Sequence, residues 1–209
     1  MITDRGRLGI DWEDALVDRV REAGRAGVHL IQIRERDLAG GALLRLTERC
    51  VDAVRGTATR VVVNDRFDVA LRGGAHGVHL RGDSMSAVRV RRHAPAGFLV
   101  GQSVHGVEDA AAVDADGAVD YLIFGHVFET VSKPGRAAAG PFGLAAVAAA
   151  TVVPVLAVGG VTAETAGRVA RAGASGIAAI GLFCDTRMAS MRRVVDRVTA
   201  AFDTCEGVP

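Results

Sequence analysis

The sequence has no apolar run of roughly 18 or more residues, only three cysteines and a single lysine among its 209 residues. Without such a run we expect no membrane-spanning helix, and the first residues, MITDRGRLGID, lack the apolar centre of a signal peptide. The cysteines, Cys50, Cys184 and Cys205, are odd in number and widely spaced. They fit neither a disulfide framework nor a zinc motif, and they indicate a reducing, cytoplasmic location.

The sequence also has little net charge, +1, and its basic residues are scattered. Scattered charge gives no electrostatic basis for binding nucleic acid or an anionic membrane. Lys133 is the one lysine among 25 basic residues, in a chain that otherwise uses arginine. Hydrophobic residues make up 49%, which excludes a disordered chain and predicts a substantial core.

Short runs rich in Val, Ile and Leu recur along the chain, each about the length of a strand buried on both faces of a parallel sheet. They are VHLIQIR (28–34), RVVVND (60–65), GVHL (77–80), GFLVGQS (97–103), DYLIFG (120–125), VPVLAVGG (153–160) and SGIAAIG (175–181), and the start, MITDR, would supply one more. Apolar residues at helical spacing lie between them. They predict helices at Asp11–Ala26, Leu43–Val54, Arg66–Arg72, Ser86–His93, Val107–Asp116, Leu144–Ala150, Ala163–Ala172 and Asp185–Phe202.

Seven or eight such units follow one another without a linker, a proline-rich stretch or a block of charge. This pattern predicts one α/β domain over residues 1–209. An open doubly wound sheet and a closed barrel both satisfy the pattern, but an open sheet rarely needs eight parallel strands. We therefore predict a single (β/α)8 TIM barrel, whose chemistry lies at the carboxyl ends of the strands.

Polar residues are concentrated at the predicted strand ends, where a barrel would bring them to a single rim. They are Thr3, Asp4, Gln32, Arg34, Glu35, Arg36, Asn64, Asp65, His79, Arg81, Gln102, Ser103, His105 and His126. Every strand ends in polar residues somewhere, so one such residue means little. A set drawn from most of the strands indicates a site.

Glycines follow the last two predicted strands, in VLAVGGVTAET and IAAIGLF. Gly159 and Gly160, with Thr162 as the expected N-cap, would leave backbone N–H groups open at a helix start. Barrels often bind phosphate in these two loops, so we predict phosphate binding at Gly159, Gly160, Ile180 and Gly181. The alternative is that the paired glycines only form a tight turn.

The loop FGHVFETVSKPG places His126 directly after a strand and Lys133 seven residues later. A histidine, whose ordinary pKa is about 6.5, suits proton transfer near neutral pH, and a lysine suits an anion clamp. Gly135 and the run RAAAG at 136–140 predict a flexible lid over the rim. Without further context such a histidine is more often a hydrogen-bonded structural residue, and such a lysine a solvated one.

The segments IQIRERD, VNDRFDVAL, GVHLRGD, GQSVH, GHVFETVSKPG, VLAVGGV and GIAAIGLF resemble the thiamine phosphate synthase superfamily in the same order, from about Met1 to Phe183. The resemblance implies a barrel that acts on a phosphorylated thiazole, and it implies a homodimer. It also implies one of two activities. Thiamine phosphate synthase joins a pyrimidine pyrophosphate to a thiazole phosphate with magnesium, whereas thiazole tautomerase isomerises a carboxythiazole phosphate to its aromatic form without a metal.

Three features resemble the tautomerase branch. The synthase pattern HLGQDD, whose last aspartate holds magnesium, reads HLRGDS here and ends in Ser84, so that Asp65 is the one matching metal carboxylate. The synthase usually has Gly-Pro where this chain has Gly125-His126, and GQSVH is similar to the tautomerase version of that strand. We therefore predict a metal-independent tautomerase in which, as the resemblance implies, His126 is the acid–base residue. The predicted substrate-binding residues are Arg34, Asn64, Ser103 and Lys133.

Two alternatives stay open. Thiamine phosphate synthase would hold Mg²⁺ at Asp65, and a barrel that binds thiamine intermediates without turnover is the other possibility. The residues that match the synthase's substrate positions are Arg34, Arg36, Asn64, Asp65, Thr130, Ser132 and Lys133. Cys184 follows the last strand, but no histidine partner for a nucleophile is evident, and the six histidines show no metal-ligand spacing.

Overall fold

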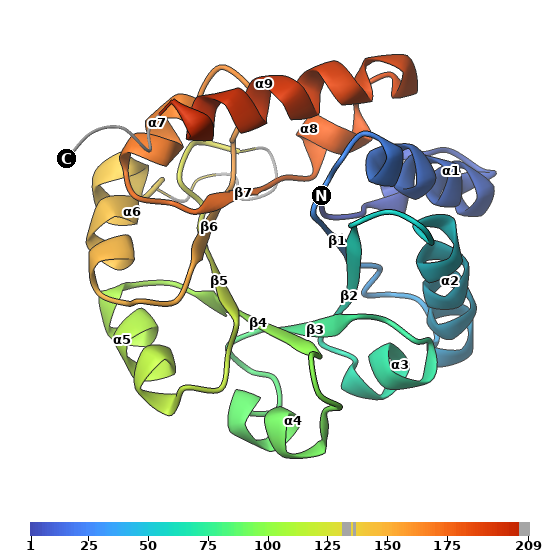
Figure 1. Ribbon diagram of the computed structural model, residues 1–209, viewed down its shortest axis with the longest axis horizontal. Coiled ribbons are helices and arrows are strands. Elements are labelled where there is room, and N and C mark those ends of the chain that lie inside the picture. The colour runs from blue at the N-terminus through green and yellow to red at the C-terminus, as the bar shows by residue number, and fades with distance from the viewer. Residues whose placement is uncertain (131–134, 136, 205–209) are drawn as a thin grey trace.

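The computed structural model describes residues 1–130, 135 and 137–204, and in them seven parallel strands curve around a common centre with the helices outside (Figure 1). Each strand pairs with the next in chain order. Their bounds are β1 Leu30–Ile33, β2 Arg60–Asn64, β3 Gly77–Leu80, β4 Leu99–Val104, β5 Tyr121–Gly125, β6 Val155–Val158 and β7 Gly176–Ala178. Apart from Val104, every strand residue falls within one of the seven apolar runs, so the predicted parallel α/β sheet is confirmed.

The N-terminal segment lies between the two edges of this curved sheet, as the position of the N-terminus in Figure 1 shows. Ile2 N donates to Ala179 O, just after β7, at 2.9 Å, and Thr3 N donates to Gln32 O of β1 at 2.9 Å. The segment forms one parallel bridge with β1, because the 3₁₀ helix η1 (Arg5–Arg7) begins directly after it. The predicted eight strands are therefore seven within the described residues, in a TIM-barrel-like arrangement.

The helices alternate with the strands, and none of those described is long and apolar enough to cross a membrane. Their bounds are α1 Trp12–Arg25, α2 Gly40–Ala53, α3 Phe67–Arg72, α4 Ala87–His93, α5 Val107–Asp116, α6 Gly140–Ala149, α7 Ala166–Arg171, α8 Gly181–Cys184 and α9 Met191–Asp203, with a second 3₁₀ helix, η2, at Met188–Ser190. Each predicted helix overlaps one of these elements, so the alternating order is confirmed.

Two predicted helix boundaries were wrong for identifiable reasons. The predicted helix Asp185–Phe202 begins only at Met191, because η2 and the turn before it occupy the first part of that range. Helix α6 begins at Gly140, earlier than predicted, since the proline that follows it has a backbone angle suited to the first helical turn. The lid predicted at 136–140 therefore ends in a helix start.

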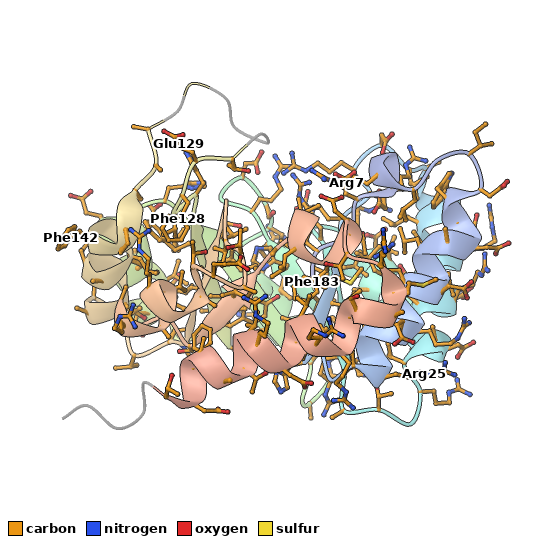
Figure 2. All side chains as sticks on the ribbon, turned by 90° about the horizontal axis from the view of Figure 1, so that it is seen from above. Arg7, Arg25, Phe128, Glu129, Phe142 and Phe183 are labelled. Atoms are coloured by element: carbon orange, nitrogen blue, oxygen red, sulfur yellow. The ribbon has the colours of Figure 1, made fainter. Side chains whose placement is uncertain are left out.

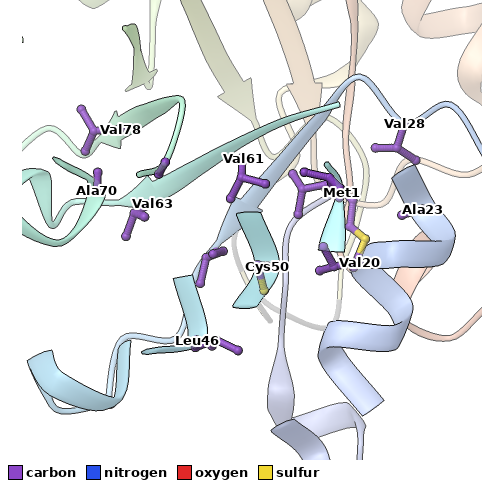
Figure 3. Close-up of a cluster of buried hydrophobic side chains, with 14 of the residues drawn as sticks. Met1, Val20, Ala23, Val28, Leu46, Cys50, Val61, Val63, Ala70 and Val78 are labelled. Atoms are coloured by element: carbon purple, nitrogen blue, oxygen red, sulfur yellow. The ribbon is translucent and has the colours of Figure 1, made fainter. Parts of the chain in front are cut away.

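The larger core cluster lies between the first strands and the helices that cover them (Figure 3). Val20 of α1 and Leu46 of α2 are fully buried there, together with Val61 and Val63 of β2. Full burial of a side chain of this size contributes about 1.5–3 kcal/mol, so these contacts hold both helices against the sheet. The buried stripe on α1 follows the helical spacing that predicted it.

A buried pair of side chains attaches the N-terminal segment to the end of β1. Thr3 is fully buried, and its hydroxyl donates to Oε1 of Glu35 at 2.6 Å. The same Thr3 oxygen accepts from the backbone N–H of Arg34 at 2.9 Å, and the backbone N–H of Arg5 donates to Oε2 of Glu35 at 3.2 Å. One hydroxyl thereby links the segment to the backbone of a predicted substrate-binding residue.

Replacing Thr3 by valine should lower the free energy of unfolding by about 2–3 kcal/mol, because a buried carboxylate loses a donor and a backbone N–H loses its acceptor. Thr3→Ser keeps the hydroxyl and should cost only about 1 kcal/mol for the lost methyl group. Urea denaturation of the two variants beside the wild type measures the difference. Equal stability of the two variants would contradict a role for the hydroxyl.

Candidate functional site

The carboxyl ends of the strands carry polar side chains at one edge of the molecule. Figure 2 labels Glu129, which follows β5, and Arg7, in η1, at this edge. The buried members of the predicted rim are Thr3, Gln32, Glu35, Asn64, His79 and His126. Burial of a polar group is costly unless the group is hydrogen-bonded, so the partners of these side chains show how the site is built.

Arg34 and Asn64, two of the predicted substrate-binding residues, lie at neighbouring strand ends. Nε2 of Gln32 donates to Oδ1 of Asn64 at 3.4 Å across the β1–β2 pair, which orients the asparagine amide. Arg34 is half-buried, and burial together with the like charge of Arg36 lowers the pKa of its guanidinium. A guanidinium stays protonated in proteins, so Arg34 gains from a bound anion.

Ser103, the third predicted substrate-binding residue, is held by a buried histidine. Nε2 of His79 lies 2.9 Å from Oγ of Ser103, and Nδ1 lies 3.3 Å from the hydroxyl of Tyr121. The rings of His79 and Tyr121 stack with their centres 5.6 Å apart. Burial, and then the positive charge of Arg34, lowers the pKa of His79 to about 4. His79 is therefore neutral near pH 7 and positions Ser103 without contributing charge.

Sequence reasoning missed Tyr121, because this residue begins a strand instead of ending one. A Cβ atom at Gly101 would lie 2.1 Å from Cζ of Tyr121, so the neighbouring strand must have glycine at that position. The sequence could have indicated Tyr121, because it is the chain's only tyrosine and lies in an apolar run, where a buried hydroxyl needs a hydrogen-bond partner.

The depressed pKa of His79 should make the protein less stable as the pH falls from about 6.5 to about 4. In that range the unfolded chain takes up a proton that the folded chain does not, so stability decreases toward low pH, by up to about 3 kcal/mol. His79→Gln should remove this part of the slope, and His93→Gln, at an exposed position, should leave it unchanged. Urea denaturation between pH 4 and pH 7 tests this, and equal slopes for His79→Gln and wild type would contradict it.

Asp65, the predicted metal carboxylate, is engaged by neighbouring side chains. Its Oδ1 accepts a hydrogen bond from Oγ of Ser84, and its Oδ2 lies 3.7 Å from Nη1 of Arg81. Oγ of Ser84 also accepts from the backbone N–H of Arg81 at 2.7 Å. Asp65 has φ of 65°, the one positive φ at a residue other than glycine in the described part of the chain. Such a conformation costs about 1–3 kcal/mol and is found most often at functional sites.

His126 lies buried after β5, against the glycine pair that follows β6. A Cβ atom at Gly159 would lie 2.2 Å from Cβ of His126, and one at Gly160 would lie 2.3 Å from the carbonyl oxygen of Glu129. The backbone N–H of Phe128 donates to Gly159 O at 3.0 Å, which joins the two loops directly. Both glycines have positive φ, 94° and 63°. The contact between the loops therefore requires glycine at both positions, whatever ligand binds there.

The residues predicted to bind phosphate follow β6 and β7, which are neighbours in the sheet. Thr162 was expected to cap the next helix, and its side chain makes the bonds of a cap. Oγ1 of Thr162 accepts from Thr165 N at 3.3 Å, and Thr162 N donates to Oγ1 of Thr165 at 2.9 Å, although α7 itself begins at Ala166. Gly181 begins α8, where a Cβ atom would lie 3.0 Å from Oδ2 of Asp185, whose carboxylate pairs with Arg7 at 2.7 Å. Phosphate binding by Gly159, Gly160, Ile180 and Gly181 stays a prediction.

Gly159→Ala should destabilise the protein by about 1–3 kcal/mol more than Gly117→Ala does. Both glycines have positive φ, but a Cβ atom at Gly117 would meet nothing within 4 Å, whereas one at Gly159 would overlap His126. The matched pair separates the steric contact from backbone strain. Urea denaturation of both variants gives the difference, and equal losses would contradict the close packing of the two loops.

Several predicted residues lie elsewhere or carry no chemistry. Ser132 and Lys133 lie outside the described residues. Cys184 is buried, its thiol donates to Ile2 O at 3.6 Å, and burial raises its pKa to about 11, which does not suit a nucleophile. Nδ1 of His76 accepts from the backbone of Val61 at 2.9 Å, a structural role. No group of three or more His, Cys, Asp or Glu side chains in the described part of the chain could hold a metal ion.

The chain is similar to proteins of one family. A family model described as thiamine monophosphate synthase matches residues 1–183. A thiamine-phosphate synthase of Chlorobium luteolum is 37% identical over 171 residues, which are 81% of this chain and 80% of the relative. One of Roseiflexus castenholzii is 40% identical over 183 residues, which are 86% of this chain and 78% of the relative. The solved structure of thiamine phosphate pyrophosphorylase from Pyrococcus furiosus has a TM-score of 0.83 and 29% identity, and the match covers 99% of this chain and 95% of that one.

Proposed function

Because the chain belongs to the thiamine monophosphate synthase family, we propose that it is a thiamine-phosphate synthase, a transferase that joins a pyrimidine pyrophosphate to a thiazole phosphate. The observation that carries the proposal is the 37% and 40% identity to relatives of that name over most of the chain. The sequence motifs favoured a thiazole tautomerase, an isomerase. The relatives do not support that activity as the main function, and the transferase replaces it.

The rim offers groups for both anionic substrates. In this proposal Arg34 faces the pyrophosphate, and the oriented side chains of Asn64 and Ser103 position it by hydrogen bonds. The loops after β6 and β7, with Gly159 and Gly181, take the phosphate of the thiazole. Arg36 and Thr130 belong to the same set by resemblance.

Such a transfer breaks the carbon–oxygen bond to the pyrophosphate and bonds that carbon to the thiazole. Negative charge accumulates on the departing pyrophosphate, so fixed cationic donors lower the barrier. Arg34 is such a donor, because its side chain is half-buried at the end of β1 and its guanidinium stays protonated. His79, neutral and stacked on Tyr121, keeps the hydroxyl of Ser103 in one orientation.

Magnesium, which the synthase resemblance implies, does not fit the residues present. Ser84 stands where the family motif has its second metal carboxylate, and its hydroxyl donates to Asp65. The other oxygen of Asp65 faces the guanidinium of Arg81 at 3.7 Å. A cation at this carboxylate would displace both partners and would lie beside a positive charge.

A thiazole tautomerase is the second candidate. The contacts of Asp65 with Ser84 and Arg81 favour it, because they oppose metal binding and that reaction needs no metal. It requires one group that takes a proton from the ring system and returns it at another position. The buried His126 at the end of β5 is the candidate for that group. The two functions share the phosphate loops and differ in the role of His126.

The remaining expectations belong to the same proposal. The chain would be one domain over residues 1–209 that acts as a homodimer in the cytoplasm and binds neither nucleic acid nor membranes. Cys50 and Cys184 are both buried as free thiols, which suits a reducing compartment.

Purified protein should form thiamine phosphate when given the pyrimidine pyrophosphate and the thiazole phosphate together, and neither substrate alone should yield product. Ser103→Ala should lower kcat/KM about 10–100-fold through the loss of one hydrogen bond to a charged group. His93→Gln, on the exposed end of α4, is the control and should retain full activity. The assays are run with magnesium and with chelator.

A second assay uses the non-aromatic carboxythiazole phosphate and follows its isomerisation by absorbance, with His126→Asn beside the wild type. Fast isomerisation that His126→Asn abolishes, without thiamine phosphate formation in the first assay, would replace the synthase by the tautomerase. Absence of turnover in both assays would leave a barrel that only binds such intermediates.

A further inference from the structure

We infer that Arg81 takes the place of a divalent cation at this rim, so that the chain binds the phosphate or pyrophosphate of its substrate through guanidinium groups. The inference deepens the proposed function and rests on it only in requiring a phosphorylated substrate at this site. It is carried by the turn Arg81–Ser84 after β3 and by Asp65 after β2, which contact one another.

The carboxylate of Asp65 already has two partners within the chain. One oxygen accepts from Ser84, and the other faces Arg81, whose side chain is 36% exposed while that of Asp65 is 35% exposed. A guanidinium beside a carboxylate makes that carboxylate a poorer ligand for Mg²⁺, which requires near-ideal octahedral geometry and gives up its waters reluctantly. The same arrangement places a permanent positive charge where the ion would otherwise supply one.

The guanidinium of Arg81 is fixed in place. Its Nη2 donates to Oδ2 of Asp83 at 2.6 Å, and its own backbone N–H donates to Oγ of Ser84 at 2.7 Å. The turn and the end of β2 therefore hold both ends of the residue. A guanidinium has five N–H donors in a planar fork that matches phosphate oxygens, and one hydrogen bond to Asp83 leaves donors for a ligand.

Arg81 does not act alone, because Arg34 is close enough for the two positive charges to interact. The like charges of Arg36 and Arg81 add to burial in lowering the pKa of Arg34. The carboxylates of Asp4 and Glu35 also interact with Arg34, so acidic side chains balance the guanidiniums at this part of the rim. An anion bound between Arg34 and Arg81 would relieve the repulsion between these two guanidiniums, which suits a phosphate or pyrophosphate group.

The backbone of Asp65 supports a functional rather than a structural origin for this arrangement. The residue is held at φ of 65°, and its N–H donates to His79 O at 2.8 Å on the neighbouring strand. A strained residue persists only where the surroundings fix it. In this conformation the carboxylate of Asp65 lies 3.7 Å from Nη1 of Arg81, whose guanidinium also pairs with Asp83.

The test uses the full chain and inorganic pyrophosphate as the probe, with binding measured by titration calorimetry in EDTA and in excess Mg²⁺. We expect wild type to bind in EDTA, and Arg81→Gln to weaken that binding at least about tenfold by removing a charged donor. Arg89→Gln, an exposed arginine on α4 of the same βα unit, is the matched control and should change affinity less than about twofold. Thermal melts verify that all variants fold.

A second variant combines Arg81→Gly with Ser84→Asp and rebuilds the two-carboxylate pattern. It should bind pyrophosphate only when Mg²⁺ is present. The inference would be overturned if wild type bound pyrophosphate only with Mg²⁺, or in neither condition. Equal affinities of Arg81→Gln and Arg89→Gln for pyrophosphate would overturn it as well. Turnover is followed on the same preparations. Thiamine phosphate formation without binding in EDTA would overturn the inference alone, and metal-free binding without turnover would overturn only the proposed synthase.

Discussion

The hydrogen bonding of the N-terminal segment to both edges of the sheet is the constraint on which the site depends. Ile2 bonds beyond β7 and Thr3 bonds to β1, so neither edge is left with a full row of unpaired backbone groups. The same closure brings the end of β1 beside the end of β7. Arg34 and the glycines after β6 and β7 lie on one rim only because the sheet curves back on itself in this way.

The interior polar groups are satisfied by each other before any ligand arrives. Gln32 orients Asn64, His79 orients Ser103, and Ser84 bonds Asp65. Burying one member of such a pair without its partner would cost free energy, whereas burying both members hydrogen-bonded to each other costs little. The side chains of the rim are therefore positioned by the fold before a substrate binds. The guanidiniums of Arg34 and Arg81 lie at the same rim, and in the proposed function they face the anionic substrate.

The architecture could be predicted from the sequence because each strand is a compact apolar run, and such runs are the strongest local signal of a buried parallel sheet. The predicted eighth strand is absent from the described residues because the N-terminal segment forms a single bridge, at Ile2, before η1 begins. The helix after Cys184 was misplaced because apolar spacing continues through a turn that only tertiary packing creates. The strand ends predicted Arg34, Asn64, Asp65, Ser103 and His126 at the rim, and the structure places all five there. The contact of Tyr121 with His79 and that of Arg81 with Asp65 could not be predicted. Each joins different strands, and the spacing of residues along the sequence does not show which strands are neighbours.

The glycine pair after β6 also has an evolutionary consequence. Since Gly159 lies against His126 and Gly160 against the backbone of Glu129, the loops after β5 and β6 are packed as one unit. A longer or bulkier loop at one position cannot be accepted without a compensating change at the other. The two loops must therefore diversify in step, and a new substrate preference on this side of the rim would require paired mutations.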